Sequence, residues 1–297
     1  MTASSPATQA WERERGRLLG IAYRMLGDLG HAEDVVSEVA IDALREERAG
    51  TREVRSWPAL LTTMCVRRSI DRLRAEIAVR EDYVGHWLPE PVATERLPED
   101  AIADRELLSH ALLHLAEQLA PEARAALVLH RAFGMPTREI AEILEKSPTA
   151  VRQLLSRAER RLRIDATSTP PRSADREALA RLVAAIEEGE IDAVVTLLED
   201  DAILWADGGG RVRSALNPVF GAEKVARFLR GIVERARAHD AVHPLRGGLV
   251  EVNGETALLL HYSGHDAVVT IELGDSGRIR ALRQVANPEK LRHARAA

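Results

Sequence analysis

The sequence predicts a multidomain protein in which two all-α helical domains precede one α+β domain. Through residues 11–79 and 101–164, apolar residues recur at offsets of three and four, the spacing that places them on one face of a helix. Residues 165–173 form a linker with two prolines, and beyond it short apolar segments alternate with turn formers such as Asn253-Gly254. That second pattern is typical of strands. A chain of 297 residues is long enough for several domains.

Composition and charge limit the possible classes of protein. The chain is 45% hydrophobic and 29% charged, which is typical of a globular protein. Cys65 is the only cysteine, which excludes an internal disulfide and favours a cytoplasmic location. No apolar run approaches the ~20 residues of a membrane span, and residues 1–10 do not resemble a signal peptide. The net charge of −5 argues against a uniformly basic nucleic-acid-binding surface but permits a local one.

The first helical domain is expected over residues 11–79, after a disordered terminus at residues 1–10. The apolar pattern predicts helices at residues 11–26, 31–44 and 56–78. A break at Gly27–Gly30 separates the first two helices, and a charged loop is expected over residues 45–54.

The second and third of these helices carry opposite charges. The outer face of the second consists of Glu33, Asp34, Ser37, Glu38 and Asp42, and the third carries Arg67, Arg68, Arg72 and Arg74. An acidic helix attracts basic protein partners, and a basic helix attracts phosphates. Two ordinary solvated faces are the alternative interpretation.

Residues 80–100 are predicted to form a linker that docks on another surface. Its centre, YVGHWLPEP, runs from Tyr83 to Pro91 and combines turn formers with two large aromatic residues. Aromatic side chains and prolines in a linker favour packing against a partner.

The second helical domain, residues 101–164, is expected to hold helices at 101–119 and 121–133 and then two short helices joined by a tight turn. Ser147 fits the N-cap of the last helix, and Pro148 fits its first position. Helix-turn-helix turns often hold glycine where Glu145 or Lys146 stands, so a left-handed backbone would be costly there. The polar face of the last helix consists of Thr149, Arg152, Gln153, Ser156, Arg157 and Arg160. Such residues suit a DNA major groove, although a solvated amphipathic helix has the same pattern.

The C-terminal domain, residues 174–297, is predicted to be α+β with a mostly antiparallel sheet. Helices are expected at residues 175–188 and 222–238, with a short helix ending near Leu198. The predicted strands cover residues 202–206, 250–252, 257–262, 267–273 and 279–285. The first strand is followed by Asp207-Gly208-Gly209-Gly210.

Together these blocks resemble the group IV, or extracytoplasmic-function, sigma factors of the sigma-70 family. GIAYRMLGDLGHAEDVVSEVAIDAL is similar to their core-polymerase-binding helices, and WPALLTTMCVRRSIDRLRA is similar to their minus-ten-reading helix. The block from ALLHLAEQLAP to LLSRAERRL resembles their minus-thirty-five-reading domain. The C-terminal part resembles a SnoaL-like domain of the nuclear-transport-factor-2-like cone fold. YVGHWLPEP, DGGG, NPVFG and NPEKLR match the subgroup that carries such a domain in cis.

The resemblance implies specific roles for residues of the helical domains. The acidic face from Glu33 to Asp42 would bind the β′ clamp of core RNA polymerase. The β subunit of the polymerase would be a second partner. The minus-ten element would be read by Trp57, Met64, Arg67, Arg68, Asp71, Arg72 and Arg74, and the minus-thirty-five element by the polar face from Thr149 to Arg160. Arg67 stands where many family members have Asn, so the family's minus-ten preference does not transfer.

For the C-terminal domain, the resemblance implies a regulator in cis rather than an enzyme. The expected regulatory contact joins the linker residues Tyr83, Trp87, Leu88 and Pro89 to the loop residues Asp207, Gly208, Gly209, Gly210 and Arg211. Arg211 replaces the Lys of the subgroup's DGGGK. With regulation in cis, no dedicated anti-sigma factor, cofactor or metal is expected, and no membrane contact.

Three alternatives remain open at this stage. The first is a helix-turn-helix regulator that never meets polymerase. The second is a sensor whose SnoaL-like domain binds a small molecule in a pocket lined by Trp205, Asp207, His261, Tyr262 and His265. The third is an enzyme that uses Asp207 or His261 as general base.

Overall fold

The computed structural model describes residues 5–50, 53–102, 108–162, 172–188, 191–240 and 245–295. The chain divides into two units. The N-unit comprises Met1–Glu81, Leu97–Leu108 and Leu115–Ser168, and the C-unit comprises Asp82–Arg96, Ser109–His114 and Thr169–Ala297. The segment from Tyr83 to Pro91, which we call the linker motif, therefore belongs to the C-unit. The second linker, residues 165–173, lies outside the described residues except for its last two.

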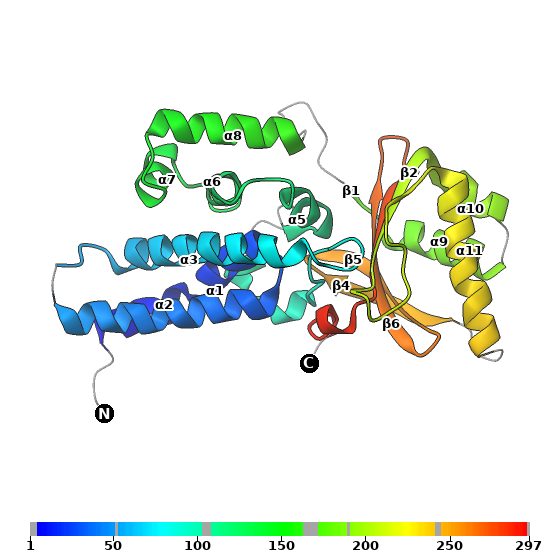
Figure 1. The fold of residues 1–297 in the computed structure, drawn as a ribbon, viewed down its shortest axis with the longest axis horizontal. Coiled ribbons are helices and arrows are strands. Elements are labelled where there is room, and N and C mark those ends of the chain that lie inside the picture. The colour runs from blue at the N-terminus through cyan, green and yellow to red at the C-terminus, as the bar shows by residue number, and fades with distance from the viewer. Residues whose placement is uncertain are drawn as a thin grey trace. The chain divides into compact units, whose positions relative to one another are not determined.

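Three long helices open the N-unit (Figure 1): α1 (Pro6–Leu26), α2 (Leu29–Ala49) and α3 (Trp57–Arg80). Each begins at a side-chain cap, in which Ser5, Asp28 or Ser56 accepts a hydrogen bond from a first-turn N–H. Gly27 ends α1 in the left-handed conformation that glycine adopts without steric cost.

Two of the predicted boundaries in this region are wrong. Residues 6–10 were expected to be disordered, but they form the start of α1 because Ser5 caps the helix and Pro6 suits its first turn. Residues 45–49 were expected to be a loop, but they extend α2 to its cap at Gly50 because Arg, Glu and Ala are strong helix formers. Residues 1–4 and 51–52 lie outside the described residues.

The remaining helices of the helical region are short: α4 (Glu99–Ile102), α5 (His110–Ala116), α6 (Pro121–Arg131), α7 (Thr137–Ile143) and α8 (Pro148–Leu162). The single helix predicted over residues 101–119 is wrong over its described part, because residues 108–109 are not α-helical and α5 begins at His110 and ends at Ala116. Ser147 caps α8 as predicted, with its Oγ 3.1 Å from the Ala150 nitrogen. Glu145 adopts the costly left-handed conformation, with φ of 53°.

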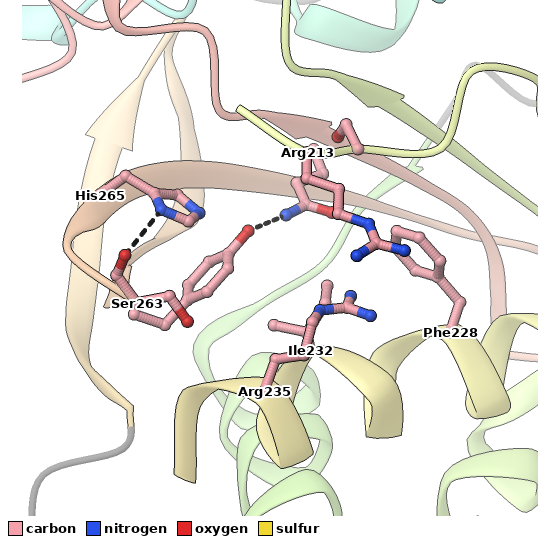
Figure 2. Close-up of a pocket in the computed structure, with 9 residues that line it drawn as sticks. Arg213, Phe228, Ile232, Arg235, Ser263 and His265 are labelled. Carbon is pink, nitrogen blue, oxygen red and sulfur yellow. Dashed lines mark hydrogen bonds between the residues drawn. The ribbon is translucent and has the colours of Figure 1, made fainter. Parts of the chain in front are cut away.

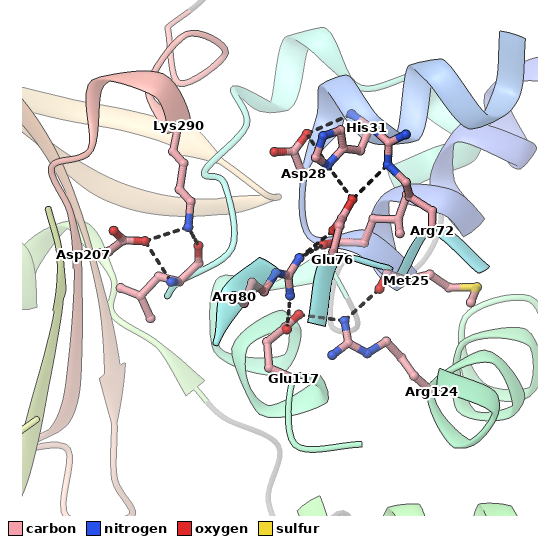
Figure 3. A network of polar contacts seen from close by, with 12 residues as sticks. Met25, Asp28, His31, Arg72, Glu76, Arg80, Glu117, Arg124, Asp207 and Lys290 are labelled. Carbon is pink, nitrogen blue, oxygen red and sulfur yellow. Dashed lines mark hydrogen bonds and ion pairs between the residues drawn. The ribbon is translucent and has the colours of Figure 1, made fainter. Parts of the chain in front are cut away.

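A buried arginine ties α6 to the end of α1 within the N-unit (Figure 3). Arg124 is 1% exposed, and its Nη1 donates to the carbonyl of Met25 at 2.7 Å and to Glu117 at 2.6 Å. Glu117 also forms an ion pair with Arg80, at the end of α3. A buried charge is tolerated only with such partners, so this network fixes how the helices of the N-unit pack.

The C-unit is built on a twisted sheet with the strand order β3-β2-β7-β6-β5-β4, and β1 pairs with β6. Its strands are β1 (Arg172–Ser173), β2 (Leu198–Asp207), β3 (Val219–Phe220), β4 (Arg246–Val252), β5 (Glu255–Tyr262), β6 (His265–Leu273) and β7 (Ile279–Val285). The β2–β7 pair is parallel and the other pairs are antiparallel. The predicted α+β fold class and mostly antiparallel sheet are confirmed.

The two faces of this sheet have different coverings. One face packs against α9 (Arg176–Glu188), α10 (Ile191–Leu197) and α11 (Ala222–His239), and Leu204 and Leu282 lie in that core (Figure 1). The other face contacts the linker motif and the first turn of α5. For example, the Arg283 Nε lies 3.2 Å from the His114 Nδ1.

The C-terminal segment adds one turn of 3-10 helix, η3 (Pro288–Lys290), and η1 (Thr94–Arg96) follows the linker motif. Within the described residues, no helix has both the length and the apolar character that crossing a membrane requires.

Candidate functional sites

The acidic face of α2 and the basic face of α3 pair with each other. The Arg68 Nε donates to Asp42 at 2.8 Å, and a terminal guanidinium nitrogen of Arg68 forms an ion pair with Glu38. A longer contact, 3.7 Å, joins Arg72 to Asp34. The two charged faces therefore share a border, because the apolar stripes that pack α2 against α3 leave these charges on neighbouring edges of the two helices.

The remaining predicted minus-ten residues lie along α3. Arg67 donates to the carbonyl of Ile143 at 3.2 Å and forms an ion pair with Glu145 at 2.8 Å, in the turn before α8. Arg74 forms ion pairs with Asp71 and Glu122. Trp57 and Met64 are half-buried. The arginines of α3 are therefore neutralised by carboxylates, which they must leave in order to bind phosphates.

The α8 helix has a different electrostatic character. Its back is buried through Val151, Leu155, Ala158 and Leu162, and all six predicted minus-thirty-five residues on its front are exposed. Among the described residues, no carboxylate forms an ion pair with Arg152, Arg157 or Arg160. This face is therefore available to an anionic partner.

A buried aspartate at the end of β2 joins that strand to the linker motif. Asp207 is 0% exposed. Its Oδ1 accepts from the Tyr83 hydroxyl at 2.6 Å. Its Oδ2 accepts from the Leu88 nitrogen at 2.9 Å and from the Lys290 Nζ at 2.7 Å, and Figure 3 shows Lys290 reaching Asp207. We call Tyr83, Leu88, Asp207 and Lys290 the Asp207 clasp. It brings together three segments that are far apart in the sequence.

The linker motif also contacts Lys290 through its aromatic rings and His110 through a carbonyl group. The Lys290 Nζ lies 3.9 Å from the centroid of the Trp87 ring and 4.9 Å from that of Tyr83, as in cation–π contacts. The carbonyl of Pro89 accepts from the His110 Nε2 at 2.8 Å. Burial, followed by the hydrogen bond to Asp207, raises the pKa of Tyr83 well above its usual range, which keeps the phenol protonated as a donor.

The three glycines after Asp207 allow the linker to approach closely. A Cβ on Gly209 would lie 2.3 Å from the Asn287 Nδ2 and 3.0 Å from the Tyr83 hydroxyl oxygen, and one on Gly208 would lie 2.1 Å from the Val212 carbonyl oxygen. Gly209 also has φ of 55°. Arg211, in contrast, forms an exposed ion pair with Glu289 at 3.1 Å and not with the linker.

Two histidines have lowered pKa values: His110, which is bonded to the linker motif, and His86, which belongs to it. His110 is fully buried, and burial lowers its pKa to about 4. Because its Nε2 donates to the Pro89 carbonyl, its Nδ1 is the acceptor for the Thr270 hydroxyl at 2.9 Å, which defines the neutral tautomer. Burial also lowers the pKa of His86, whose Nε2 lies 2.7 Å from that of His114.

We expect acid to destabilise the C-unit. The folded-state pKa of His110 is below its unfolded value, so the unfolded chain binds the extra proton. The contribution of neutral His110 to the free energy of unfolding is fully present above about pH 6.5 and is lost as the pH falls towards about 4. Between pH 7.5 and 5.5 the loss is about 1 kcal/mol from His110 alone. Urea unfolding at both pH values checks this, and H110Q should show a shallower pH dependence. An equal slope in H110Q would contradict the assignment.

The C-unit also holds a cavity, and only part of its expected lining is correct. Tyr262 and His265 do line it (Figure 2). Asp207 lies in the clasp instead, and Trp205 is on the opposite face of the sheet, where its ring stacks with the Arg283 guanidinium at 5.1 Å. His261 is exposed and 2.8 Å from Asp266. All three residues lie on strands, where neighbouring side chains face opposite sides of the sheet. The sequence alone did not show which of the two sides faces the cavity.

The sequence did not lead us to several residues that lie at the cavity and at the Asp207 clasp. In the cavity it missed Arg213, Arg235 and Gln284. Arg235 follows Phe228 and Ile232 at offsets of seven and three on α11, and this spacing would have placed it on their face. At the clasp it missed Lys290 and Asn287, although both belong to the motif NPEKLR.

Comparisons with known proteins identify the family. Residues 10–77 match the model of Sigma-70 region 2, and residues 109–162 match that of Sigma-70, region 4. The ECF RNA polymerase sigma factor SigJ of Mycobacterium tuberculosis is 36% identical, over 94% of this chain and 91% of the relative. The chain belongs to the ECF RNA polymerase sigma factors.

Other similarities of this ECF sigma factor agree with that assignment. The crystal structure of M. tuberculosis SigJ has a TM-score of 0.76 at 33% identity, and the match covers 95% of this chain and 97% of that one. The probable ECF sigma factor SigI of the same species is 28% identical over 67% of this chain and 69% of the relative. The predicted family is therefore confirmed. Sigma factors are not enzymes, so the catalytic interpretation of Asp207 and His261 is wrong.

Proposed function

We propose that this ECF sigma factor binds core RNA polymerase through α2 and promoter DNA through α3 and α8, and that its C-unit regulates it in cis through the Asp207 clasp. The polymerase-binding residues are Glu33, Asp34, Ser37, Glu38 and Asp42. The observation that carries the proposal is the match of α1–α3 to region 2 and of α5–α8 to region 4, with the charges that each role requires.

The exposed basic face of α8 supports binding of the minus-thirty-five element. Arg152, Gln153 and Arg157 project from a helix whose back is fully packed, so their side chains are free to enter a major groove. Arg is suited to guanine and Gln to adenine. On α3, Arg67, Arg68, Arg72 and Arg74 supply the backbone contacts at the minus-ten element, and Trp57, Met64 and Asp71 complete that surface.

The clasp supports regulation in cis. The linker between regions 2 and 4 sets the reach of a protein that must occupy two promoter elements at once. The clasp holds this linker through a buried ion pair and a buried backbone hydrogen bond. Both contacts are made within the chain, so holding the linker requires no second protein. We therefore propose that no dedicated anti-sigma factor is needed.

Charge reversal on α2 tests the polymerase contact. The double variant E38K/D42K is expected to lose association with purified core polymerase, because two attractive charges become repulsive. It should also lose run-off transcription. The matched control E223K/E234K reverses two exposed acids on α11 and should behave like the wild type. Full core binding by E38K/D42K would refute the assignment of this face.

A further inference from the structure

The cavity of the C-unit has a polar outer part at its mouth. This outer hollow has a volume of about 120 Å³ and is bordered by α11, by the end of β7 and by the β5–β6 turn (Figure 2). Its polar lining consists of Arg213, Ser214, Arg235, Tyr262, Ser263, His265 and Gln284, and Phe228 and Ile232 add apolar surface.

An apolar inner hollow lies next to it, on the other side of shared lining residues. The inner hollow has about 40 Å³ and shares Ile232, Tyr262 and Gln284 with the outer one. The rest of its lining is aliphatic and consists of Val183, Ile186, Leu204, Leu229, Val233, Leu245, Leu258, Leu260 and Val269. Together the two hollows have about the size of an engineered cavity of ~150 Å³ that accepts benzene. The space therefore suits one aromatic ring with small substituents.

Two guanidinium groups meet at the mouth without a counter-charge. Figure 2 shows Arg213 and Arg235 extending into the same outer hollow. None of the residues that line either hollow is Asp or Glu, and among the described residues neither arginine forms an ion pair. Two like charges that converge on one space favour an anion there, and a carboxylate accepts from such groups in two-point fashion.

Two side chains that line the outer hollow, Gln284 and His265, each hold a buried acceptor atom with no partner among the described residues. The two atoms are the Gln284 Oε1 and the His265 Nε2. The Gln284 Nε2 donates to the Tyr262 hydroxyl, and the His265 Nδ1 donates to the Ser263 carbonyl at 3.2 Å, which leaves the other polar atom of each side chain as an acceptor. Burial lowers the pKa of His265, in agreement with a neutral ring. A buried acceptor without a partner is costly, so a ligand that brings a donor is favoured.

From this geometry we infer that the C-unit binds a small hydroxylated aromatic carboxylate. The carboxylate lies between Arg213 and Arg235, the ring extends towards the inner aliphatic hollow, and the hydroxyl donates to Gln284 or His265. Binding at this site does not depend on the proposed promoter-directed function, and the two are measured separately.

Binding of 3-hydroxybenzoate to the full-length chain, followed by titration calorimetry and by thermal unfolding, tests the inference. We expect a Kd in the millimolar range or tighter and a rise in melting temperature. The neutral analogue 3-hydroxybenzamide should bind at least about tenfold more weakly, because it offers no charge to the arginines. Failure of 3-hydroxybenzoate to bind, or equal binding of the amide, would overturn the inference.

Variants separate the two recognition elements. R213Q and R235Q should each weaken 3-hydroxybenzoate about tenfold, whereas R230Q, on the same helix but outside the cavity, should not. Q284L should reduce the advantage of 3-hydroxybenzoate over benzoate. Unchanged binding in both cavity arginine variants would overturn the inference, even if the ligand binds elsewhere.

Discussion

Replacement of Lys290 by Met is expected to lower the free energy of unfolding of the C-unit by about 3 kcal/mol. Asp207 is fully buried, and Lys290, itself 7% exposed, is its counter-charge. Removal of one member of a buried ion pair leaves an uncompensated charge, which typically costs 3–5 kcal/mol. We expect the lower end of this range, because the hydroxyl of Tyr83 and the amide of Leu88 still donate to the Asp207 carboxylate. Urea unfolding of the full-length protein measures the change.

The adjacent ion pair supplies the control for this prediction. Glu289 pairs with Arg211, but both side chains are more than half exposed. E289A is therefore expected to change stability by less than about 0.5 kcal/mol. If K290M cost no more than E289A, Lys290 would not be the counter-charge that the clasp requires.

Replacement of Gly209 by Ala is expected to destabilise the C-unit by about 3 kcal/mol and to release the linker. An alanine at φ of 55° is strained, at a cost of about 1 kcal/mol, and its Cβ would collide with Asn287 and Tyr83. Hydrogen exchange of the Leu88 amide reports the release directly, because that amide is bonded to Asp207 in the clasp.

Gly277 provides a matched comparison for this substitution. It has φ of 74° but open space around its Cβ position, so G277A should show only the conformational cost of about 1 kcal/mol. If the clasp regulates in cis, run-off transcription should change in G209A and not in G277A. Loss of Leu88 protection with unchanged transcription would contradict the regulatory proposal and leave the contact itself intact.

Local signals in the sequence were sufficient to predict many elements. Ser147 and Pro148 located the start of α8, and alternating apolar residues located β5, β6 and β7 within a few residues. These signals succeed because a cap or a strand depends on residues that are close in sequence. The same local signals failed at residues 45–49, where strong helix formers were interpreted as a charged loop.

Contacts between distant segments were beyond such reasoning. Asp207 was placed directly after a strand and is in fact the last residue of β2, but its contacts with Tyr83 and Lys290 join segments that are far from it in the sequence. The place of Arg235 at the mouth of the cavity likewise depends on how α11 packs against β2. The charges on α2 and α3 were read correctly, whereas their mutual pairing depends on how the two helices pack.

That mutual pairing has a consequence for the salt dependence of promoter binding. A basic surface normally sheds condensed cations from DNA as it binds, and affinity falls steeply with ionic strength in proportion to the phosphates contacted. Arg68 and Arg72 instead carry built-in anions, in Glu38, Asp42 and Asp34, that must be displaced first. Core polymerase that occupied those carboxylates would set the guanidinium groups free, so the holoenzyme should respond to salt more steeply than the isolated subunit.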